Sequence, residues 1–331
     1  MFTALVITRL IVNAFYAVGL RSEKLYYRPK KEREPIDFLS KKKVFFTISL
    51  VLIAAGVITI GVNAGRGKGA FAYSLEFQGG TSTNVTFDKD YSIDEIDKEI
   101  VPVVEKVTGD NNVQTQKVAG TNQVIIKTVT LDLDKREALN KAMVDNFGVD
   151  ESKITAENIS STVSNEMRRD AVIAVVIATI CMLLYIWFRF KDIRFATSAV
   201  LALLHDVLVV VGFYAIARIS VGNTFIACML TIVGYSINAT IVIFDRIREE
   251  MRGKTKSSDV AAVVNKSITQ TLTRSIYTSL TTFIMVAVLY VMGVSSIKEF
   301  ALPLMVGVVC GAYSSVCITG ALWYVMKRFK K

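Results

Sequence analysis

The feature that most limits how this chain can fold is a series of apolar stretches, each close to the length of a membrane-crossing helix. A helix rises about 1.5 Å per residue, so about 20 apolar residues are needed to cross the hydrocarbon core of a bilayer. Six or seven stretches reach that length, at residues 2–20, 44–64, 170–188, 195–217, 222–244, 276–294 and 301–326. The chain is 52% hydrophobic, which is high for a soluble domain of 331 residues. We predict a polytopic α-helical membrane protein.

Basic residues are unevenly distributed between these stretches. Lys and Arg number nine in 21–43, three in 189–194, six in 246–266 and four in 327–331. The short loops 218–222 and 293–300 carry one each. Cytoplasmic loops of membrane proteins carry the excess of Lys and Arg. The pattern therefore places the basic loops in the cytoplasm and the long segment 65–169 outside, and it explains the net charge of +10 without nucleic acid.

These features divide the chain into five parts. We predict an extra span at 1–20, a basic cytoplasmic linker at 21–43, a first main span at 44–64, an external domain at 65–165 and a five-span membrane bundle at 166–331. The four cysteines all fall in apolar spans, and no disulfide framework is visible. The expected location is a cell membrane, crossed several times.

The external segment has the pattern of a small α+β domain. Predicted strands at 73–87, 112–118, 123–129 and 153–160 alternate with predicted helices at 92–109 and 132–148. Gly79 and Gly80 interrupt the first strand, where a bulge is expected. Ser92 and Glu95 form a capping box, and Pro102 is expected to kink the first helix. The order β-α-β-β-α-β is the ferredoxin-like pattern, and no nucleophile with an adjacent base is visible in it.

Polar residues inside the later spans are candidate functional groups, because ionisable side chains in membranes are costly. Asp206 follows Arg194 by 12 residues, which is about 18 Å along a helix and near the middle of a bilayer core. Ser236 and Asn238 lie in the next span. The span after that repeats polar residues every four positions, at Gln270, Arg274, Thr278 and Thr282. The alternative reading is that the hydroxyls only bridge helices, and that His205 only bonds to a neighbouring helix.

Four motifs, in order, resemble the SecD/SecF family of protein-export membrane subunits. "LEFQGGT", which contains Phe77, Gly79, Gly80 and Thr81, resembles the family element that follows the first main span. "ALLHDVLVVVGFYAI", "VGYSINATIVIFDRIREEMR" and "NKSITQTLTRSIYTSLTT" resemble the third, fourth and fifth spans of SecF. The resemblance runs from about Ile36 to the C-terminus. "FTALVITRLIVN" near the start instead resembles the last span of SecD, so the chain is expected to be the SecF half of a SecD–SecF pair, separate or fused.

The resemblance implies a resistance-nodulation-division fold with six SecF-type spans and an external ferredoxin-like domain. It implies no enzyme activity, no cofactor and no metal site. The expected role is an accessory subunit of the Sec translocase that completes polypeptide export with the ion-motive force, with SecD, the SecYEG channel and unfolded polypeptide as partners. The expected ion pathway contains Asp206, Arg274, Asn238, Ser236, Gln270 and Thr278.

One departure from the family pattern bears on the mechanism. The family usually has an Asp after the residue here numbered Asn238, opposite Arg274, and this chain has Ala239 there. The coupling ion, proton or sodium, is therefore open. Two alternatives remain: a structural membrane scaffold that does not use ion flow, and a small-molecule or lipid exporter of the same superfamily. Such exporters usually carry much larger external domains and two six-span halves.

Overall fold

The computed structural model describes residues 6–19, 34–66, 69–110, 113–118, 120–190, 192–252, 259–293 and 295–328. The chain forms two compact units, Met1–Pro35 and Ile36–Lys331. In the first unit, helix α1 (Thr8–Ala17) has ten residues, all exposed. Ten residues are about half of what a span needs. Most of the predicted basic linker, 21–33, lies outside the described residues.

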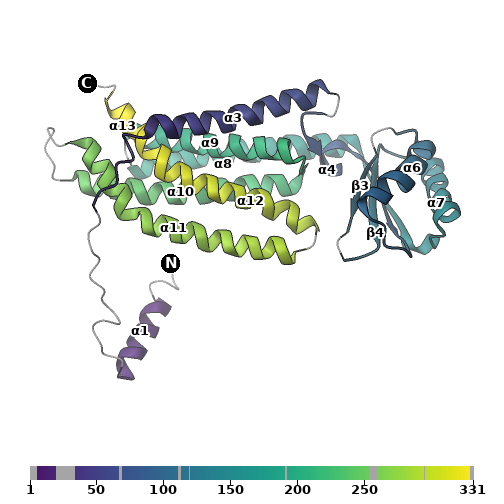
Figure 1. The fold of residues 1–331 in the computed structure, drawn as a ribbon, viewed down its shortest axis with the longest axis horizontal. Coiled ribbons are helices and arrows are strands. Elements are labelled where there is room, and N and C mark those ends of the chain that lie inside the picture. Colours follow the sequence, from purple (N-terminus) through teal and green to yellow (C-terminus); the bar gives the residue numbers. More distant parts are fainter. Residues whose placement is uncertain are drawn as a thin grey trace. The chain divides into compact units, whose positions relative to one another are not determined.

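The second unit contains six helices that are long and apolar enough to cross a membrane. They are α3 (Lys42–Gly65), α8 (Ser161–Phe190), α9 (Ile193–Ala217), α10 (Asn223–Met251), α11 (Val260–Met292) and a last span that runs without a break through α12 (Ser295–Tyr313), η4 (Ser314–Thr319) and α13 (Gly320–Arg328). They lie side by side as one bundle (Figure 1). The prediction of a multi-pass membrane protein is confirmed.

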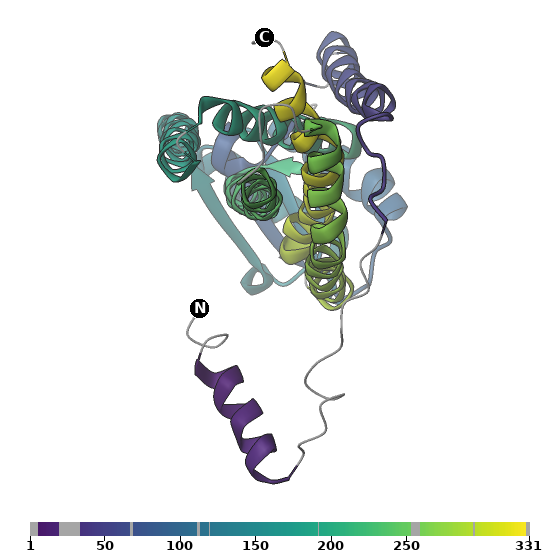
Figure 2. The same ribbon diagram turned by 90° about the vertical axis from the view of Figure 1, so that its left-hand side faces the viewer.

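The spans differ in how much of their surface the bundle covers. In the most apolar 18-residue stretch of each helix, 50% of the residues are buried in α9 and 61% in the last span. The corresponding shares are 11% in α3 and 6% in α8. Viewed end on, α3 and α8 lie at the outside of the bundle (Figure 2). Since apolar side chains on α3 and α8 face outward, these helices are suited to contact lipid, and α9, α10 and the last span form the centre.

A four-stranded antiparallel sheet follows α3 in the chain. Its strands are β2 (Gly80–Thr86), β3 (Gln114–Lys117), β4 (Gln123–Thr128) and β5 (Ile154–Ile159), in the order β3-β4-β2-β5. Helix α6 (Val101–Thr108) and helix α7 (Leu133–Phe147) lie along the sheet (Figure 1). Val85, Ile126 and Leu139 are 0% exposed and form part of the shared core. We call this unit, residues 80–159, the sheet domain.

The predicted helix ends of the sheet domain are confirmed. The capping box of Ser92 and Glu95 forms at the start of α5 (Ile93–Glu95). Helix α7 ends at Gly148, whose φ of 66° is the left-handed conformation typical of a helix end. A kink is expected at Pro102, but the helix departs from α geometry before that residue. That departure is the π-helical turn η2 (Ile96–Ile100), which runs directly into α6, so Pro102 lies just after a widened turn and not within a regular α-helical hydrogen-bond ladder.

The prediction of one strand over 73–87 is wrong in its first half. The segment forms β1 (Ala72–Tyr73), a single helical turn α4 (Leu75–Gln78) and only then β2. Strand β1 pairs in parallel with β6 (Ser220–Val221), which lies between α9 and α10. Phe77 is 4% exposed and belongs to an apolar cluster of the membrane bundle. Burial of Phe77 therefore outweighs the strand pattern, and Gly79 and Gly80, with φ of 74° and 136°, allow the turn into β2.

Candidate functional site

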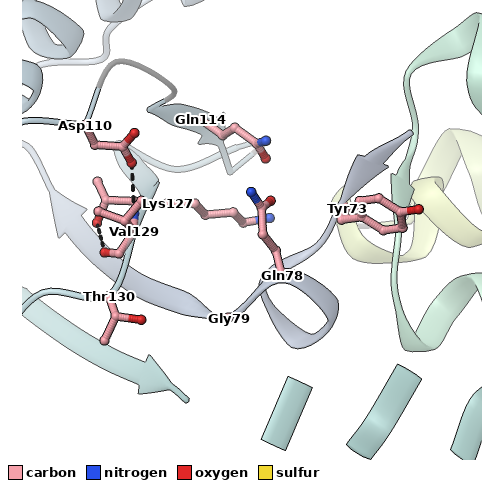
Figure 3. A pocket seen from close by; sticks show the side chains of 9 residues that line it. Tyr73, Gln78, Gly79, Asp110, Gln114, Lys127, Val129 and Thr130 are labelled. Carbon is pink, nitrogen blue, oxygen red and sulfur yellow. Dashed lines mark hydrogen bonds between the residues drawn. The ribbon is translucent and has the colours of Figure 1, made fainter. Parts of the chain in front are cut away.

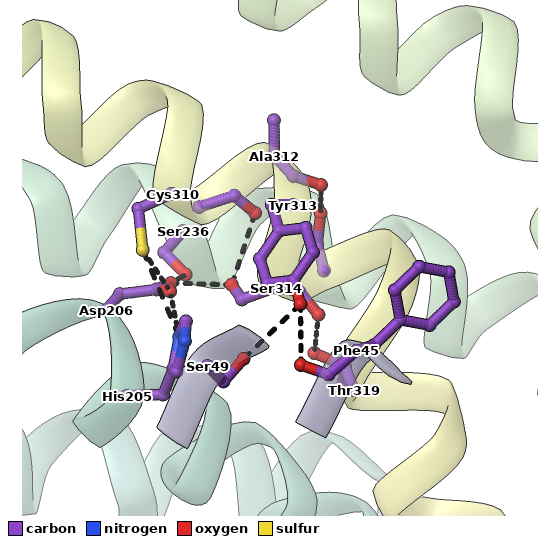
Figure 4. A network of polar contacts seen from close by, with 12 residues as sticks. Phe45, Ser49, His205, Asp206, Ser236, Cys310, Ala312, Tyr313, Ser314 and Thr319 are labelled. Carbon is purple, nitrogen blue, oxygen red and sulfur yellow. Dashed lines mark hydrogen bonds and ion pairs between the residues drawn. The ribbon is translucent and has the colours of Figure 1, made fainter. Parts of the chain in front are cut away.

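The centre of the bundle contains a carboxylate that is fully enclosed by polar groups. Asp206 of α9 is 0% exposed. Its Oδ2 accepts hydrogen bonds from the hydroxyls of Ser236 at 2.5 Å and Ser314 at 2.7 Å. Its Oδ1 lies 2.9 Å from His205 Nδ1 and accepts from the thiol of Cys310 at 3.3 Å. Figure 4 shows these groups converging on Asp206 from α9, α10 and the last span. We call these five residues the Asp206 cluster.

The chemistry of the Asp206 cluster follows from this enclosure. A buried carboxylate is costly unless it is hydrogen-bonded, neutralised by a cation or protonated. Within the described residues, the one ion-pair partner of Asp206 is His205, itself 7% exposed. Four polar contacts hold the carboxylate, yet no permanently charged cation from the described part of the chain pairs with it. Such a group changes its hydrogen-bond pattern when a proton or cation arrives, which is the behaviour that ion coupling requires.

The last span changes its helical pitch at Ser314, one helical turn after Cys310. Ser314 opens the π-helical turn η4, and the hydroxyl of Thr319 donates to the Ser314 carbonyl at 3.0 Å. π-helical turns are rare and occur often at functional sites. The extra residue per turn rotates the side chains on either side of η4 relative to a regular helix. Cys310 and Ser314 lie four residues apart on the helix that leads into this turn, so their common direction toward Asp206 agrees with regular helical spacing.

Tyr313, the residue before η4, connects the Asp206 cluster to the first main span. Its hydroxyl donates to the Phe45 carbonyl of α3 at 2.7 Å and lies 3.4 Å from the hydroxyl of Ser49. The Tyr313 ring lies 6.2 Å from the His205 ring (Figure 4). The Tyr313 side chain therefore lies between the Asp206 cluster and α3.

The remaining residues of the predicted ion pathway do not join this cluster. Asn238, Arg274 and Thr278 are exposed in the isolated chain, and Ala239 is half-buried. Within the residues that the structure describes, the Arg274 guanidinium has no ion-pair partner. Thr278 donates to the Arg274 carbonyl of its own helix at 2.9 Å. The predicted stripe is therefore an outward face of α11 in this chain and not a wall of the buried site.

Helices α10 and α11 are nonetheless joined near that face. The Tyr235 hydroxyl of α10 donates to Ser279 of α11 at 3.0 Å. Because the two helices run in opposite directions, Asn238 lies at about the level of residues 275 and 276, given a rise of about 1.5 Å per residue. Gln270 is separate from this region, since its side chain accepts from Arg246 Nε at 2.6 Å beside Glu249 and Glu250.

The "LEFQGGT" motif builds the junction between the bundle and the sheet domain. The Phe77 carbonyl accepts a hydrogen bond from Arg168 of α8, whose guanidinium lies 5.0 Å from the Tyr73 ring centre. Thr81 is 0% exposed, and its hydroxyl donates to the Asn158 side chain and accepts from the Leu131 N–H at 2.8 Å. The motif therefore fixes the direction in which β2 leaves the bundle.

A small cavity of about 300 Å³ opens beside this motif. Tyr73, Gln78 and Gly79 line one side, and Asp110 and Lys127 of the sheet domain line the other (Figure 3). Asp110 is engaged within the wall, where its carboxylate accepts from the Val129 N–H at 2.8 Å. The lining is mixed in charge, with the acidic Asp110 and the basic Lys127 on the sheet-domain side.

Comparison with known proteins identifies the family. Residues 139–329 match the family described as protein export membrane protein SecD/SecF, C-terminal, and these residues are more than half of the chain. The chain is also 36% identical to protein translocase subunit SecF of Petrotoga mobilis, covering 89% of this chain and 98% of that protein. The chain belongs to the SecD/SecF family. The resemblance found in the sequence motifs is confirmed.

Fused members of the SecD/SecF family match over more of the chain. Protein translocase subunit SecDF of Bacillus subtilis is 36% identical, over 96% of this chain and 41% of that protein. The crystal structure of SecDF, described as a translocon-associated membrane protein, from Thermus thermophilus superposes with a TM-score of 0.82 at 28% identity. The superposition covers 99% of this chain and 43% of the Thermus thermophilus chain. The fold is therefore SecDF-like.

Sequence reasoning missed two of the five residues of the Asp206 cluster. Asp206 and Ser236 were predicted as pathway residues, but Cys310 and Ser314 were not, although they lie 104 and 108 positions from Asp206. Both lie in the motif "VGVVCGAYSS", whose many small residues are typical of close helix packing. The available signal is a pair of Ser residues in a membrane span, with a Cys four residues before the first of them.

Proposed function

We propose that this chain is the SecF-type accessory subunit of a Sec protein translocase and couples late polypeptide export to the ion-motive force. The observation that carries the coupling role is the enclosed carboxylate of Asp206, held by groups from three spans without a fixed cation. The curated relatives are named protein translocase subunits, and this supports the export role. A translocase subunit of this kind has no hydrolytic activity of its own.

The proposed partners are a SecD subunit, the SecYEG channel and the emerging polypeptide. Fused SecDF relatives support association with SecD. The exposed Asn238, Arg274 and Thr278 support it as well, because a cation on the outward face of a membrane helix is costly unless a partner or water covers it. We expect this face to be covered when SecD is present.

The proposed topology places the sheet domain outside the cell, where it meets the emerging chain as a ferredoxin-like external domain. The basic segments 189–194 and 245–275 support this orientation through the positive-inside rule. For residues 1–20, we propose an extra span of the SecD type. Its support is that the alignment with a SecDF relative extends to 96% of the chain, compared with 89% for a SecF relative.

The alternative is a structural scaffold that steadies the channel without ion flow. Ala239 favours it, because the acid that the family usually has opposite Arg274 is missing. The two functions differ in one measurable respect. A coupling subunit loses export support when Asp206 loses its charge, whereas a scaffold tolerates Asp206→Asn because asparagine keeps the side-chain shape and can accept part of the hydrogen bonds.

The deciding experiment combines export and proton uptake. Asp206→Asn, the native chain and Asp170→Asn are each expressed with SecD in a strain that lacks SecF, and the same pairs are reconstituted in vesicles under an imposed gradient. Asp170 is exposed on α8, with a side chain 68% accessible, so it controls for loss of a carboxylate elsewhere in the chain. We expect Asp206→Asn to abolish gradient-dependent uptake and export support, and Asp170→Asn to retain both. Full activity of Asp206→Asn would contradict the coupling role and favour the scaffold.

A further inference from the structure

Three side chains of the Asp206 cluster present metal-binding atoms to one another. His205 Nδ1 lies 2.9 Å from Asp206 Oδ1, Cys310 Sγ lies 3.3 Å from the same oxygen, and Cys310 Sγ lies 3.9 Å from His205 Nδ1. All three residues are buried, at 7%, 0% and 7% exposure. We propose that His205, Asp206 and Cys310 bind a divalent transition-metal ion of the Zn²⁺ type in the middle of the membrane bundle.

The size of this triangle fits such an ion. From the three separations, the point equidistant from Nδ1, Oδ1 and Sγ lies about 2.0 Å from each, close to the ~2.0–2.3 Å that Zn²⁺ requires for nitrogen, oxygen and sulfur ligands. The space between the atoms is occupied by the hydrogens that they share. An ion can therefore enter by displacing protons, with small side-chain adjustments and without a shift of helices.

The charges favour a divalent ion over other cations. The Cys310 thiolate and the Asp206 carboxylate carry two negative charges between them, and neutral His205 adds none, so a divalent ion makes the complex neutral overall. A neutral complex avoids the cost of an isolated charge in a membrane interior. The mixed nitrogen, oxygen and sulfur donors suit Zn²⁺ and Co²⁺, whereas Mg²⁺ and Ca²⁺ prefer oxygen alone.

The second coordination shell is partly in place. Ser236 and Ser314 hold the other carboxylate oxygen of Asp206, which keeps Oδ1 directed at His205 and Cys310. Outer hydrogen bonds of this kind orient metal ligands. Three protein ligands leave a fourth position for water or for one of the serine hydroxyls, as in metal sites with an open coordination position. His205 Nε2 has no partner among the described residues, so the imidazole is held only at the nitrogen that faces the other ligands.

A bound ion would join α9 to the last span. It would also occupy Asp206 Oδ1, the atom that the Cys310 thiol now contacts as donor and that lies beside His205 Nδ1. The thiol proton would leave to bulk buffer, and the neutral imidazole would carry its one proton at Nε2. If Asp206 couples ion flow to export, Zn²⁺ inhibits that coupling. This consequence rests on the proposed function, whereas the binding site itself does not, so the two are measured separately.

The binding test uses Co²⁺ as an optical probe on the full-length chain, purified in detergent with its thiols reduced. We expect one Co²⁺ per chain with a thiolate-to-cobalt charge-transfer band, displaced by added Zn²⁺. Cys310→Ser should remove the band, and His205→Gln should weaken binding by more than about tenfold, the loss typical even of outer-shell changes. Cys317→Ser is the matched control, because it changes a thiol in the same span outside the cluster and should leave binding unchanged.

Specific results would overturn the site. They are a native chain without a thiolate band at saturating Co²⁺, a band that survives Cys310→Ser, or a band lost in Cys317→Ser. Because Cys310→Ser could disturb folding, each variant is first checked for native helicity and monodispersity, and His205→Gln gives an independent test. Zn²⁺ retained after desalting, counted by elemental analysis in each variant, supplies the second readout. Failure of the proposed function would leave these results unchanged, since none of them measures export.

Discussion

A methyl group added at Gly56 of α3 would lie 2.7 Å from the Cα atom of Gly212 in α9. The reverse addition at Gly212 would lie 2.9 Å from the Gly56 Cα atom. The two helices therefore meet backbone to backbone, at a distance that only glycine permits. This contact lies in the interface that attaches α3, whose apolar surface is otherwise largely exposed, to the centre of the bundle.

We predict that Gly56→Ala or Gly212→Ala loosens α3 from the bundle. The added methyl forces the backbones apart, and overpacking of this kind costs about 1–3 kcal/mol. Thermal unfolding in detergent measures the loss. Gly61→Ala is the control, because Gly61 lies in the same helix with no atom within 4 Å of an added methyl. Equal stability of Gly56→Ala and Gly61→Ala would show that the helices do not pack this closely.

A second prediction concerns the buried hydroxyl of Thr81. Thr81→Val keeps the side-chain shape but leaves the Leu131 N–H and the Asn158 side chain without this partner. An unsatisfied buried group costs about 1–3 kcal/mol, so the sheet domain should be destabilised by that amount. Hydrogen exchange of β4 and β5 amides in the full chain measures the change. Thr83→Val, at a site 1% exposed with no side-chain hydrogen bond among the described residues, should have a much smaller effect.

The capping box at the start of α5 gives a pH-dependent prediction. The Ser92 N–H and the Lys89 ammonium stabilise the ionised Glu95 carboxylate and lower its pKa from 4.5 to about 2. Since the folded pKa is below the unfolded value, this contribution to stability is present above about pH 4.5. It is lost as the pH falls toward 2. The difference between Glu95→Gln and the native chain should therefore shrink over this window.

Hydrogen exchange of residues 93–108, corrected for the intrinsic pH dependence of exchange, tests this prediction. Asp94→Asn removes a charge from the same helix start without removing a hydrogen bond within the described chain, so it controls for the helix dipole. A difference between Glu95→Gln and the native chain that persists unchanged at pH 2 would assign the effect to side-chain packing instead of to charge.

The fourth prediction concerns the missing acid at Ala239. Ala239 lies one residue from the exposed Asn238, and α10 is joined to α11 near Arg274 through the Tyr235–Ser279 hydrogen bond. Ala239→Asp should introduce a carboxyl group on this face, separate from the buried Asp206 site, and restore part of the proton uptake lost in Asp206→Asn. Uptake by vesicles that hold the chain with SecD measures it. The double variant with Asp206→Asn and Ala239→Asp is compared with one that carries Asp206→Asn and Ala239→Asn. Equal proton uptake by the two would show that residue 239 takes no part in coupling.

Hydrophobic length and charge placement were sufficient to predict the six spans of the bundle, because each span satisfies its own backbone hydrogen bonds and needs little tertiary information. Capping residues predicted helix ends in the sheet domain for the same local reason. The turn at Leu75–Gln78 was not predictable in this way. Its helical geometry depends on the burial of Phe77 in an apolar cluster. The buried residues of that cluster belong mainly to helices more than 100 residues later in the chain.

The polar residues show the same difference between local pattern and tertiary fold. The four-residue spacing of Gln270, Arg274 and Thr278 correctly placed them on successive turns of one helix, but spacing alone does not say whether the rest of the chain covers that face. Asp206 was singled out because a deep carboxylate is costly wherever it points. Its partners Cys310 and Ser314 required the tertiary fold, since nothing local relates them to a carboxylate on another span.

The π-helical turn η4 sets how many residues this span can carry while its two ends keep their contacts. The wide turn holds one more residue than a regular turn, so the helix before it and the helix after it keep nearly the relative orientation of a regular helix that is one residue shorter. If the same residues closed into regular α-helix, Tyr313 would rotate by about 100° relative to everything that follows. The hydrogen bond from Tyr313 to Phe45, or the packing of Trp323 beyond the turn, would then be lost. An inserted residue in this interval would misalign the two ends in the same way, whereas a substitution changes one side chain.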